Sequence, residues 1–262
     1  MNIDLSGKRA LVCGASQGIG KAAAIELAAL GASITLAARD PDRLQAAMSE
    51  LPTPKGQRHE FLALDFSQPE RVRVMLAGAI DAARPFSILV NNSGGPPPGT
   101  ALDARPEDFL ACLNAQLFSA VLITQLLVPQ FKELKYGRII NIISTSVKQP
   151  IPNLGVSNTV RAAVASWAKT LASELGPFGI TVNNVLPGYT QTERLASLVK
   201  GRATKAGTSP ESVAAELIAT IPAGRFGKPE ELGAAVAFLA SPAAGYINGI
   251  NLPVDGGRLG TL

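Results

Sequence analysis

A glycine-rich turn near the start of the chain has residue types and spacing that could do chemistry. It reads Gly14-Ala15-Ser16-Gln17-Gly18-Ile19-Gly20, between a short apolar run and an amphipathic stretch. Glycines permit a tight turn and let a pyrophosphate approach backbone N–H groups, and a helix start adds a favourable positive potential. Such turns also serve packing alone, but the position of this one favours nucleotide binding. The expected contacts are Gly14, Ser16, Gln17, Gly18, Ile19 and Gly20.

The end of the next apolar run bears on which dinucleotide would bind. An acidic residue at this point would accept hydrogen bonds from ribose hydroxyls and favour NAD. Ala38 and Arg39 stand there instead, and a guanidinium can stack on adenine and pair with a 2′-phosphate. The sequence therefore favours NADP(H) over NAD(H). The open alternative is that Arg39 is a solvated loop residue and Asp40 a simple helix cap.

Two hydroxyls and one cation lie at a distinctive spacing in the middle of the chain. Ser157 follows Ser144 by thirteen residues, and Arg161 follows Ser157 by four. The hydroxyl of Ser157 reaches less far than a phenol and is a far weaker acid, since a phenol has a pKa of about 10. Arg161 stays protonated and cannot shuttle a proton. It could hold ribose hydroxyls, bind a carboxylate through two hydrogen bonds or stabilise a developing oxyanion.

Together, the glycine turn and this spacing resemble the short-chain dehydrogenase/reductase family, and within it the 3-oxoacyl-acyl-carrier-protein reductases. The resemblance implies a serine that orients the substrate oxygen, a tyrosine that transfers the proton, and a lysine that lowers the tyrosine pKa and holds the nicotinamide ribose. An asparagine in the preceding helix holds a water that leads to the lysine. Here Ser144 and Asn114 match the serine and the asparagine. Ser157 and Arg161 replace the tyrosine and the lysine, and these four residues are the expected catalytic positions.

Further motifs extend the resemblance over essentially the whole chain. Asn91-Asn92-Ser93-Gly94 is similar to the family's Asn-Asn-Ala-Gly, and the residues from Pro187 to Thr192 are similar to its Pro-Gly turn beside the nicotinamide amide. Relatives that use NADP often place a second cation where this chain has Gln17, which counts against NADP(H). The resemblance implies cofactor contacts at Asp65, Phe66, Asn92, Gly94, Arg161, Pro187, Gly188, Thr190 and Thr192, and a substrate pocket at Tyr189 and Ser146.

These residues predict an NADP(H)-dependent oxidoreductase that acts on a carbonyl or alcohol substrate with an atypical active site. A water held by Ser157 in the space of the missing ring would complete the proton path. Tyr189 could instead supply the phenol, or it could be an aromatic wall of the pocket. The alternative function is a catalytically silent NADP(H)-binding protein, acting as a redox sensor or as a non-catalytic subunit.

The elements that must position these residues alternate along the chain. Apolar runs predict seven strands at 9–13, 33–37, 60–64, 88–91, 138–143, 181–186 and 251–254, with helix-like stretches at 18–30, 41–50, 69–83, 106–134, 154–175 and 229–240. This alternation indicates a Rossmann-like, doubly wound α/β fold, with a parallel sheet and helices on both faces in one domain. The longer stretch 190–222 includes a helix-prone piece at 211–221. We expect it to be a lid over the substrate, or a surface excursion without a gating role.

Composition fits a buried core and limits the partners. Of 262 residues, 47% are hydrophobic and 17% charged, the formal charge is +4, and no basic run with interleaved aromatics indicates nucleic acid. Cys13 and Cys112 lack metal-ligand spacing, so we expect buried thiols and no metal. No signal peptide and no uninterrupted apolar run of roughly 20 residues is evident, so we expect a cytoplasmic protein without a membrane partner. The family resemblance implies a small-molecule substrate and a homo-oligomer, either a tetramer or a dimer.

Overall fold

A seven-stranded sheet forms the centre of the protein, whose computed structural model describes residues 1–261. The strand order is β3-β2-β1-β4-β5-β6-β7, and every neighbouring pair is parallel. The order changes direction between β1 and β4, and ligands of such sheets bind at the carboxyl ends of the strands beside this point. The doubly wound fold expected from the sequence is confirmed. The strands are β1 (Arg9–Cys13), β2 (Ser33–Ala38), β3 (Glu60–Ala63), β4 (Ile88–Asn91), β5 (Gly137–Ile142), β6 (Ile180–Pro187) and β7 (Asn251–Val254).

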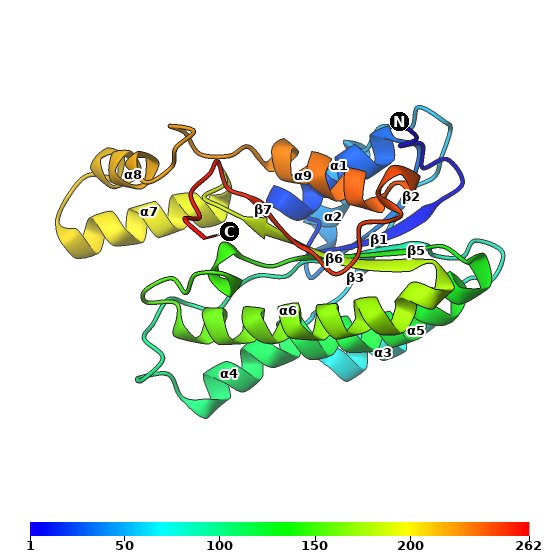
Figure 1. Ribbon diagram of the computed structural model, residues 1–262, viewed down its shortest axis with the longest axis horizontal. Helices are drawn as coiled ribbons and strands as arrows, with labels where there is room; N and C mark the ends of the chain where they lie inside the picture. Colours follow the sequence, from blue (N-terminus) through cyan, green and yellow to red (C-terminus); the bar gives the residue numbers. More distant parts are fainter. Residues whose placement is uncertain (262) are drawn as a thin grey trace.

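Helices cover both faces of the sheet (Figure 1). One apolar layer lies under α1 (Gly18–Ala29), α2 (Pro41–Ser49) and α9 (Pro229–Ala240). The other lies under α3 (Pro69–Ala77), α5 (Ser119–Leu134) and α6 (Gly155–Leu175). Successive residues of β1 enter opposite layers, so Val12 packs in the first and Leu11 in the second. Burying each such side chain stabilises the fold by about 1.5–3 kcal/mol.

A row of asparagine side chains crosses the sheet from β4 to β7. Asn91 donates to Asn141, Asn141 to Asn184, and Asn184 to Asn251, over Nδ2–Oδ1 distances of 2.9, 2.9 and 2.8 Å. The same residues are direct partners in the strand register. Because a buried amide without partners is costly, a one-residue slip of any of these strands would be opposed by the whole row.

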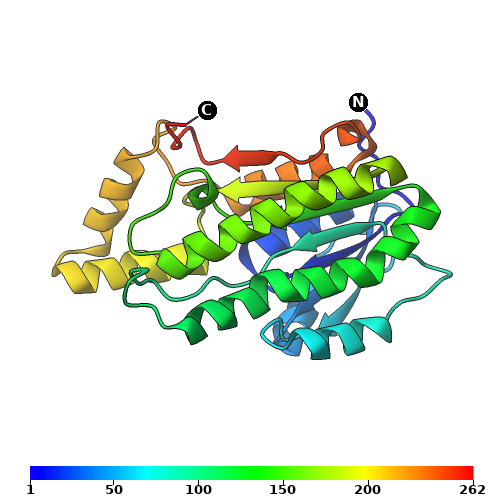
Figure 2. The same cartoon turned by 60° about the horizontal axis from the view of Figure 1, so that its bottom comes forward.

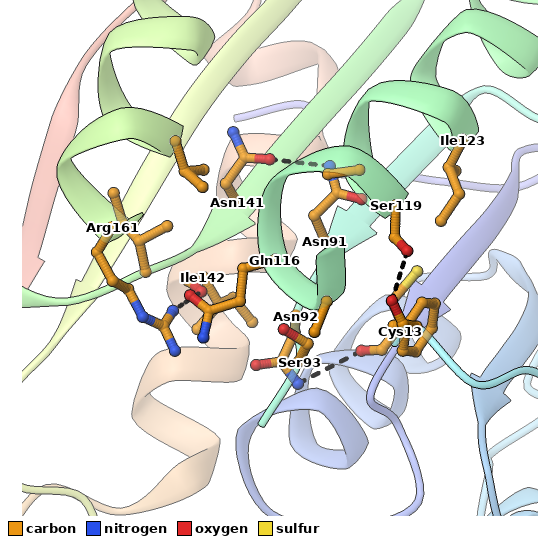
Figure 3. A pocket seen from close by; sticks show the side chains of 15 residues that line it. Cys13, Asn91, Asn92, Ser93, Gln116, Ser119, Ile123, Asn141, Ile142 and Arg161 are labelled. Atoms are coloured by element: carbon orange, nitrogen blue, oxygen red, sulfur yellow. Dashed lines mark hydrogen bonds between the residues drawn. The ribbon is translucent and has the colours of Figure 1, made fainter. Parts of the chain in front are cut away.

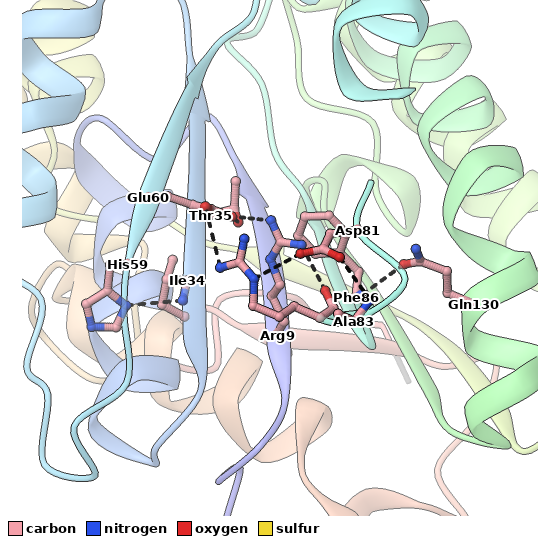
Figure 4. Close-up of polar contacts among 10 residues, drawn as sticks. Arg9, Ile34, Thr35, His59, Glu60, Asp81, Ala83, Phe86 and Gln130 are labelled. Carbon is pink, nitrogen blue, oxygen red and sulfur yellow. Dashed lines mark hydrogen bonds and ion pairs between the residues drawn. The ribbon is translucent and has the colours of Figure 1, made fainter. Parts of the chain in front are cut away.

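The opposite end of the sheet carries a second polar cluster (Figure 4). Arg9 forms an ion pair with Glu60, donates to the carbonyl oxygen of Arg84 at 2.9 Å and lies 3.9 Å above the Phe86 ring. Nearby, His59 Nδ1 accepts a hydrogen bond from the Ile34 N–H at 3.1 Å, while its Nε2 lies 3.1 Å from the Pro52 carbonyl oxygen. This histidine is therefore a structural residue, away from the carboxyl ends of the strands.

Most element bounds agree with the sequence expectations to within one residue, and two stretches differ more. The expected helix 69–83 ends at Ala77 with Gly78 as its C-cap, and in the turn that follows Asp81 accepts a hydrogen bond from the Ala83 N–H. The expected helix 106–134 consists of three parts: α4 (Pro106–Leu113), the π-helical turn η1 (Asn114–Phe118) and α5. The short 3₁₀ turns are η2 (Thr145–Val147), η3 (Gly176–Phe178) and η4 (Pro242–Ala244).

The stretch Pro106–Leu134 is long and apolar enough, by length and composition alone, to cross a membrane. In the fold it lies along one face of the sheet, where Ile123, Leu127 and Phe131 are buried in the second apolar layer. Its hydrophobicity is therefore accounted for in part by core packing. Leu110 and Phe118 remain exposed on its outer side.

The segment after β6 folds as two helices beyond the carboxyl ends of the strands (Figure 2). These are α7 (Glu193–Ala206) and α8 (Pro210–Ala219). They share a small apolar cluster of their own, which includes Leu195, Val199 and Leu217. The region expected as a lid is therefore a packed helical pair that stands at the mouth of the crevice.

Candidate active site

The residue that follows β4, Asn92, supports the glycine turn through a hydrogen bond. Asn92 Nδ2 donates to the Gly14 carbonyl oxygen at 3.1 Å. Gly14 has a φ of +59°, and a β-carbon there would lie 2.6 Å from Asn92 Nδ2. A β-carbon at Gly20 would collide with the Gly14 carbonyl oxygen. Both positions therefore require glycine, and Asn92 contacts the turn, while its expected contact with a cofactor stays a prediction.

The start of α1 is open to an anion. No side chain caps the helix at Gln17, and its first turn holds no acidic residue. The first backbone N–H groups of the helix therefore have no partner within it, and they carry the positive end of the helix dipole. Thr192 closes one side, since a β-carbon at Gly18 would lie 3.3 Å from its methyl group. These features fit a pyrophosphate, while Ser16 is partly exposed and Ile19 packs on the apolar layer below.

Two exposed arginines, rather than one, lie near the end of β2, where the adenosine of a bound dinucleotide is expected. Arg39 directly follows β2. Arg43, on α2, donates a hydrogen bond to the side-chain oxygen of Gln17 and forms an ion pair with Asp40 over 3.7 Å. Position 17 itself carries no cation, but Arg43 approaches Gln17 from another helix, where it also forms an ion pair with Glu193 over 3.6 Å.

The side chains of Asp65 and Phe66 make contacts within the protein. Asp65 accepts hydrogen bonds from the Ser67 N–H and hydroxyl at 3.0 and 2.9 Å. Burial raises the pKa of Asp65, but these hydrogen bonds, one from Gln68 and the charge of Arg39 outweigh it and lower that pKa overall. The Phe66 ring is buried in the second apolar layer. Any contact of Phe66 with adenine would therefore involve its backbone.

The residues expected around the nicotinamide meet where β6 ends. The Gly188 N–H donates to the Val254 carbonyl oxygen at 3.0 Å, and a β-carbon at Gly188 would lie 2.7 Å from the Asp255 Cα. Thr190 is buried, and its hydroxyl donates to the Gly188 carbonyl oxygen at 3.2 Å. Thr192 caps α7 by accepting from the Leu195 N–H at 3.3 Å. This turn therefore links Pro187, at the end of β6, directly to the helical pair.

Ser144 lies two residues beyond β5, and its hydroxyl oxygen already accepts one hydrogen bond. Its Oγ accepts a hydrogen bond from the Ser146 N–H at 3.0 Å. A serine hydroxyl has one hydrogen to donate, and that hydrogen remains for a substrate oxygen. Ser146 itself is buried, and its Oγ has no hydrogen-bond partner within residues 1–261.

Arg161 is held against the end of β5 (Figure 3). Its Nη1 donates to the Ile142 carbonyl oxygen at 2.8 Å. Burial, and then the charge of Arg194, lower the pKa of Arg161 to about 10. Arg161 is therefore a cation at neutral pH. It is bound to Ile142, which precedes Ser144 by two residues.

A small cavity adjoins Arg161 and has room for one water. Its volume is about 20 Å³, and Asn91, Asn141, Gln116 and Arg161 line it. The Gln116 amide points toward the Arg161 guanidinium (Figure 3), its Nε2 donates to the Gly94 carbonyl oxygen at 3.2 Å, and its Oε1 is buried without a partner in the described chain. Asn114 begins the π-helical turn but does not line this cavity. Gln116 thus occupies the place that the sequence reasoning gave to Asn114.

Ser157 and Tyr189, the two residues considered in connection with the missing phenol, have different surroundings. Ser157 is buried on α6 with a short side chain. The Tyr189 ring meets the Phe226 ring edge to face at 6.3 Å, and the Arg258 guanidinium lies 4.6 Å from its centre. It also packs against the apolar cluster of α7 and α8. This packing favours a structural role for Tyr189 over that of proton donor.

Three residues that the sequence reasoning did not assign stand at the site: Arg43, Gln116 and Arg194. Gln116 could have been found from its place two residues after Asn114. The other two depend on tertiary contacts, since Arg194 donates to the Gly95 carbonyl oxygen at 3.2 Å across the crevice. Cys13 and Cys112 are free and buried as expected. Within residues 1–261 no group of three His, Cys, Asp or Glu side chains could hold a metal ion.

A doubly wound parallel sheet with a glycine turn at the point of reversal defines a dinucleotide-binding α/β protein. Residues 14–258 match the family model described as enoyl-(acyl carrier protein) reductase. The chain belongs to the short-chain dehydrogenase/reductase family, and it is an oxidoreductase of that class.

Relatives and solved structures match nearly the full length of the chain. The 3-oxoacyl-[acyl-carrier-protein] reductase FabG of Vibrio cholerae is 35% identical over 97% of this chain and 98% of its own. The NADPH-dependent reductase BacG of Bacillus subtilis is 29% identical over 97% and 99%. The crystal structure of L-sorbose reductase from Gluconobacter frateurii with NADPH and L-sorbose is 33% identical, covers both chains fully and has a TM-score of 0.93.

Proposed function

We propose that the protein is an NADP(H)-dependent reductase that converts a carbonyl group to an alcohol with an altered proton-transfer apparatus. The observation that carries this proposal is the pairing of an oriented hydroxyl with a cation. Ser144 has its hydroxyl hydrogen free two residues beyond Ile142, whose carbonyl oxygen accepts a hydrogen bond from Arg161. A neutral donor and a positive charge are what a carbonyl oxygen needs as it gains negative charge.

The choice of NADP(H) is supported by charge at the adenosine end. Arg39 and Arg43 give two cations where a 2′-phosphate would lie, and no acidic residue stands directly at the end of β2. Two of the relatives named above are described with NADPH. When bound, the cofactor supplies a hydride to the carbonyl carbon, while the carbonyl oxygen takes one proton, so that an alcohol and oxidised cofactor result.

The proton is proposed to come from water rather than from a side chain of matched pKa. The Ser157 hydroxyl is too weak an acid, and Arg161 does not release its proton at neutral pH. Arg161 would stabilise the oxyanion, Ser144 would hold it, and a water beside Ser157 would deliver the proton. The small cavity between Arg161 and Gln116 would hold a second water behind the site.

The proposal is tested by binding and turnover on the same preparation. Purified protein is titrated with NADPH and then assayed with ketones, quinones and oxoacyl thioesters. We expect NADPH oxidation with at least one of these classes, and a kcat about a hundredfold lower in Ser144→Ala with unchanged NADPH affinity. Tight NADPH binding without turnover of any class would reject the reductase and leave the catalytically silent binding protein as the function.

The remaining expectations concern the whole molecule. We propose one dinucleotide-binding domain whose residues 190–222, including α7 and α8, act as a lid, which limited proteolysis with and without NADPH would test.

A homo-oligomer is supported by the exposed Leu110, Phe118 and Leu134 along α4 to α5, since exposed apolar residues on one helical stretch suit a protein interface. Light scattering would distinguish dimer from tetramer. A cytoplasmic location stays a prediction, tested by cell fractionation.

A further inference from the structure

Two arginines at the crevice have no acidic partner. The carboxylates of residues 1–261 lie more than 4.0 Å from the charged nitrogens of both Arg161 and Arg194, since the ion pairs involve other basic residues. Arg161 donates to the Ile142 carbonyl oxygen, and Arg194 donates to the Gly95 carbonyl oxygen. A guanidinium carries five N–H donors, so both side chains keep donors for a ligand.

The two guanidinium groups are close enough to affect one another. The charge of Arg194 contributes to the lowered pKa of Arg161, after burial. Both arginines also act on the Cys112 thiol, whose pKa burial raises and their charges lower in part. Cys112 lies on α4, and the two charges act on it from α6 and α7. Two like charges at one place disfavour each other, and an anion between them would relieve that repulsion.

Gly95 fixes where the Arg194 guanidinium lies. A β-carbon at position 95 would be 2.5 Å from Nη2, 2.8 Å from Nη1 and 2.9 Å from Cζ of Arg194. The guanidinium therefore lies directly against the backbone of the segment that follows β4. Any side chain at position 95 would push it out of this place.

A larger hollow opens beside Gly95, to which Arg194 donates, and it shares Ala115 and Gln116 with the small cavity that Arg161 lines. Its volume is about 410 Å³, and its lining includes Pro96, Pro97, Ala111, Cys112 and Val156. This size suits a small-molecule site with an apolar body. Gly95 belongs to the same lining, so Arg194 stands at its edge.

The two carboxylates of this hollow are engaged elsewhere. Asp103 accepts a hydrogen bond from the Thr100 hydroxyl, and Asp108 forms an ion pair with Arg105 at 3.1 Å. Neither forms an ion pair with Arg161 or Arg194, and Asp103 keeps its own negative charge, so a ligand carboxylate is expected at the Gly95 end of the hollow, beside Arg194.

We propose that the substrate is an oxo carboxylic acid with an apolar body. Arg194 binds the carboxylate, Arg161 lies between that carboxylate and the carbonyl oxygen, and the apolar part fills the hollow. Planar guanidinium groups suit carboxylates because they offer paired, parallel donors. This inference rests on the proposed reductase function for the carbonyl step, but carboxylate binding can be measured without turnover.

The test compares an acid with its neutral ester on the same protein. Benzoylformate and its methyl ester are titrated calorimetrically into the protein saturated with NADP⁺. We expect the acid to bind at least about tenfold tighter, as one charge-assisted contact implies. Arg194→Gln should remove the preference, and Gly95→Ala should do the same by displacing the guanidinium. Arg202→Gln, an exposed residue of the same helix, should leave it intact.

The outcomes separate this inference from the reductase proposal. Equal affinities for acid and ester, or a preference that survives Arg194→Gln in a protein with unchanged Tm, would overturn the carboxylate site. If the protein reduces the ester with NADPH as fast as the acid, the reductase stands and the carboxylate site falls. If the acid binds tightly but neither compound is reduced, nor any other carbonyl, the carboxylate site stands and the reductase falls.

Discussion

The Arg161 guanidinium on α6 is fixed to the carbonyl oxygen of Ile142, the last residue of β5, by a hydrogen bond of 2.8 Å. This bond places a permanent cation beside the strand end from which Ser144 projects. A lysine could not reach a carbonyl and a ligand at once in the same way, because its single ammonium lacks the fork of a guanidinium. The exchange to arginine therefore gives the site a charge of fixed position.

The pair Ser157→Tyr with Arg161→Lys should restore a matched proton donor. We expect kcat for carbonyl reduction to rise about a hundredfold, since general acid catalysis contributes roughly 10²–10⁴-fold. The matched control is Ser157→Phe with Arg161→Lys, which adds the ring without its hydroxyl. A rise of equal size in the control, measured by NADPH oxidation, would show that ring packing and not the phenol causes it.

Arg43→Ala should weaken NADPH binding without affecting NADH. A charge-assisted hydrogen bond contributes about 1.5–3 kcal/mol, which corresponds to a Kd roughly 10–100-fold higher. Only the 2′-phosphate distinguishes the two cofactors, so the effect must be confined to NADPH. Arg73→Ala is the control, because Arg73 is an exposed residue of α3 paired with Glu70 at 2.9 Å. Equal losses for both cofactors in fluorescence titrations would contradict the role given to Arg43.

The asparagine row should be a major source of stability at its centre and a minor one at its edge. Asn141→Ala removes two hydrogen bonds and leaves buried groups of Asn91 and Asn184 without partners. We expect the free energy of unfolding to fall by about 2–4 kcal/mol. Asn251→Ala, at the exposed end of the row, should cost only about 0.5–1.5 kcal/mol. Urea denaturation of both variants checks the order, and similar losses would mean that the row does not act as a buried network.

His59 should make stability depend on pH just below neutrality. Burial lowers its pKa, so the unfolded chain binds a proton more readily than the folded one. The contribution of neutral His59 is therefore complete above the unfolded pKa of about 6.5 and is lost as the pH falls from there toward the folded pKa. It is the only histidine, so thermal denaturation of His59→Gln across about pH 5 to 7 should show a flatter profile than the parent. Identical profiles would exclude His59 as the source.

Local sequence patterns predict much of the fold. Short apolar runs and proline or glycine boundaries place every strand of the sheet, because buried strands need continuous apolar residues. They did not reveal α7, in which Gly201 interrupts the helical pattern on an exposed face. They also did not reveal the end of α3 at Ala77, six residues before the expected end at residue 83.

The site was less accessible from the sequence, for a physical reason. The glycine turn is local, and its position follows from residues that are adjacent in the chain. Three contacts join elements that are far apart in the chain: Arg43 with Gln17, Gln116 with Arg161, and Arg194 with Gly95. Only the packed structure shows that Gln116, and not Asn114, turns toward the small cavity.

Gly95 and Arg194 share one volume, since the guanidinium fills the space that a β-carbon at position 95 would need. This ties the evolutionary histories of two positions 99 residues apart. In a lineage that keeps Arg194, alanine at position 95 would force the end of this flexible side chain to move, whereas a lineage that has lost Arg194 does not face that cost. Among relatives, glycine at position 95 should therefore accompany the arginine more often than other residues do.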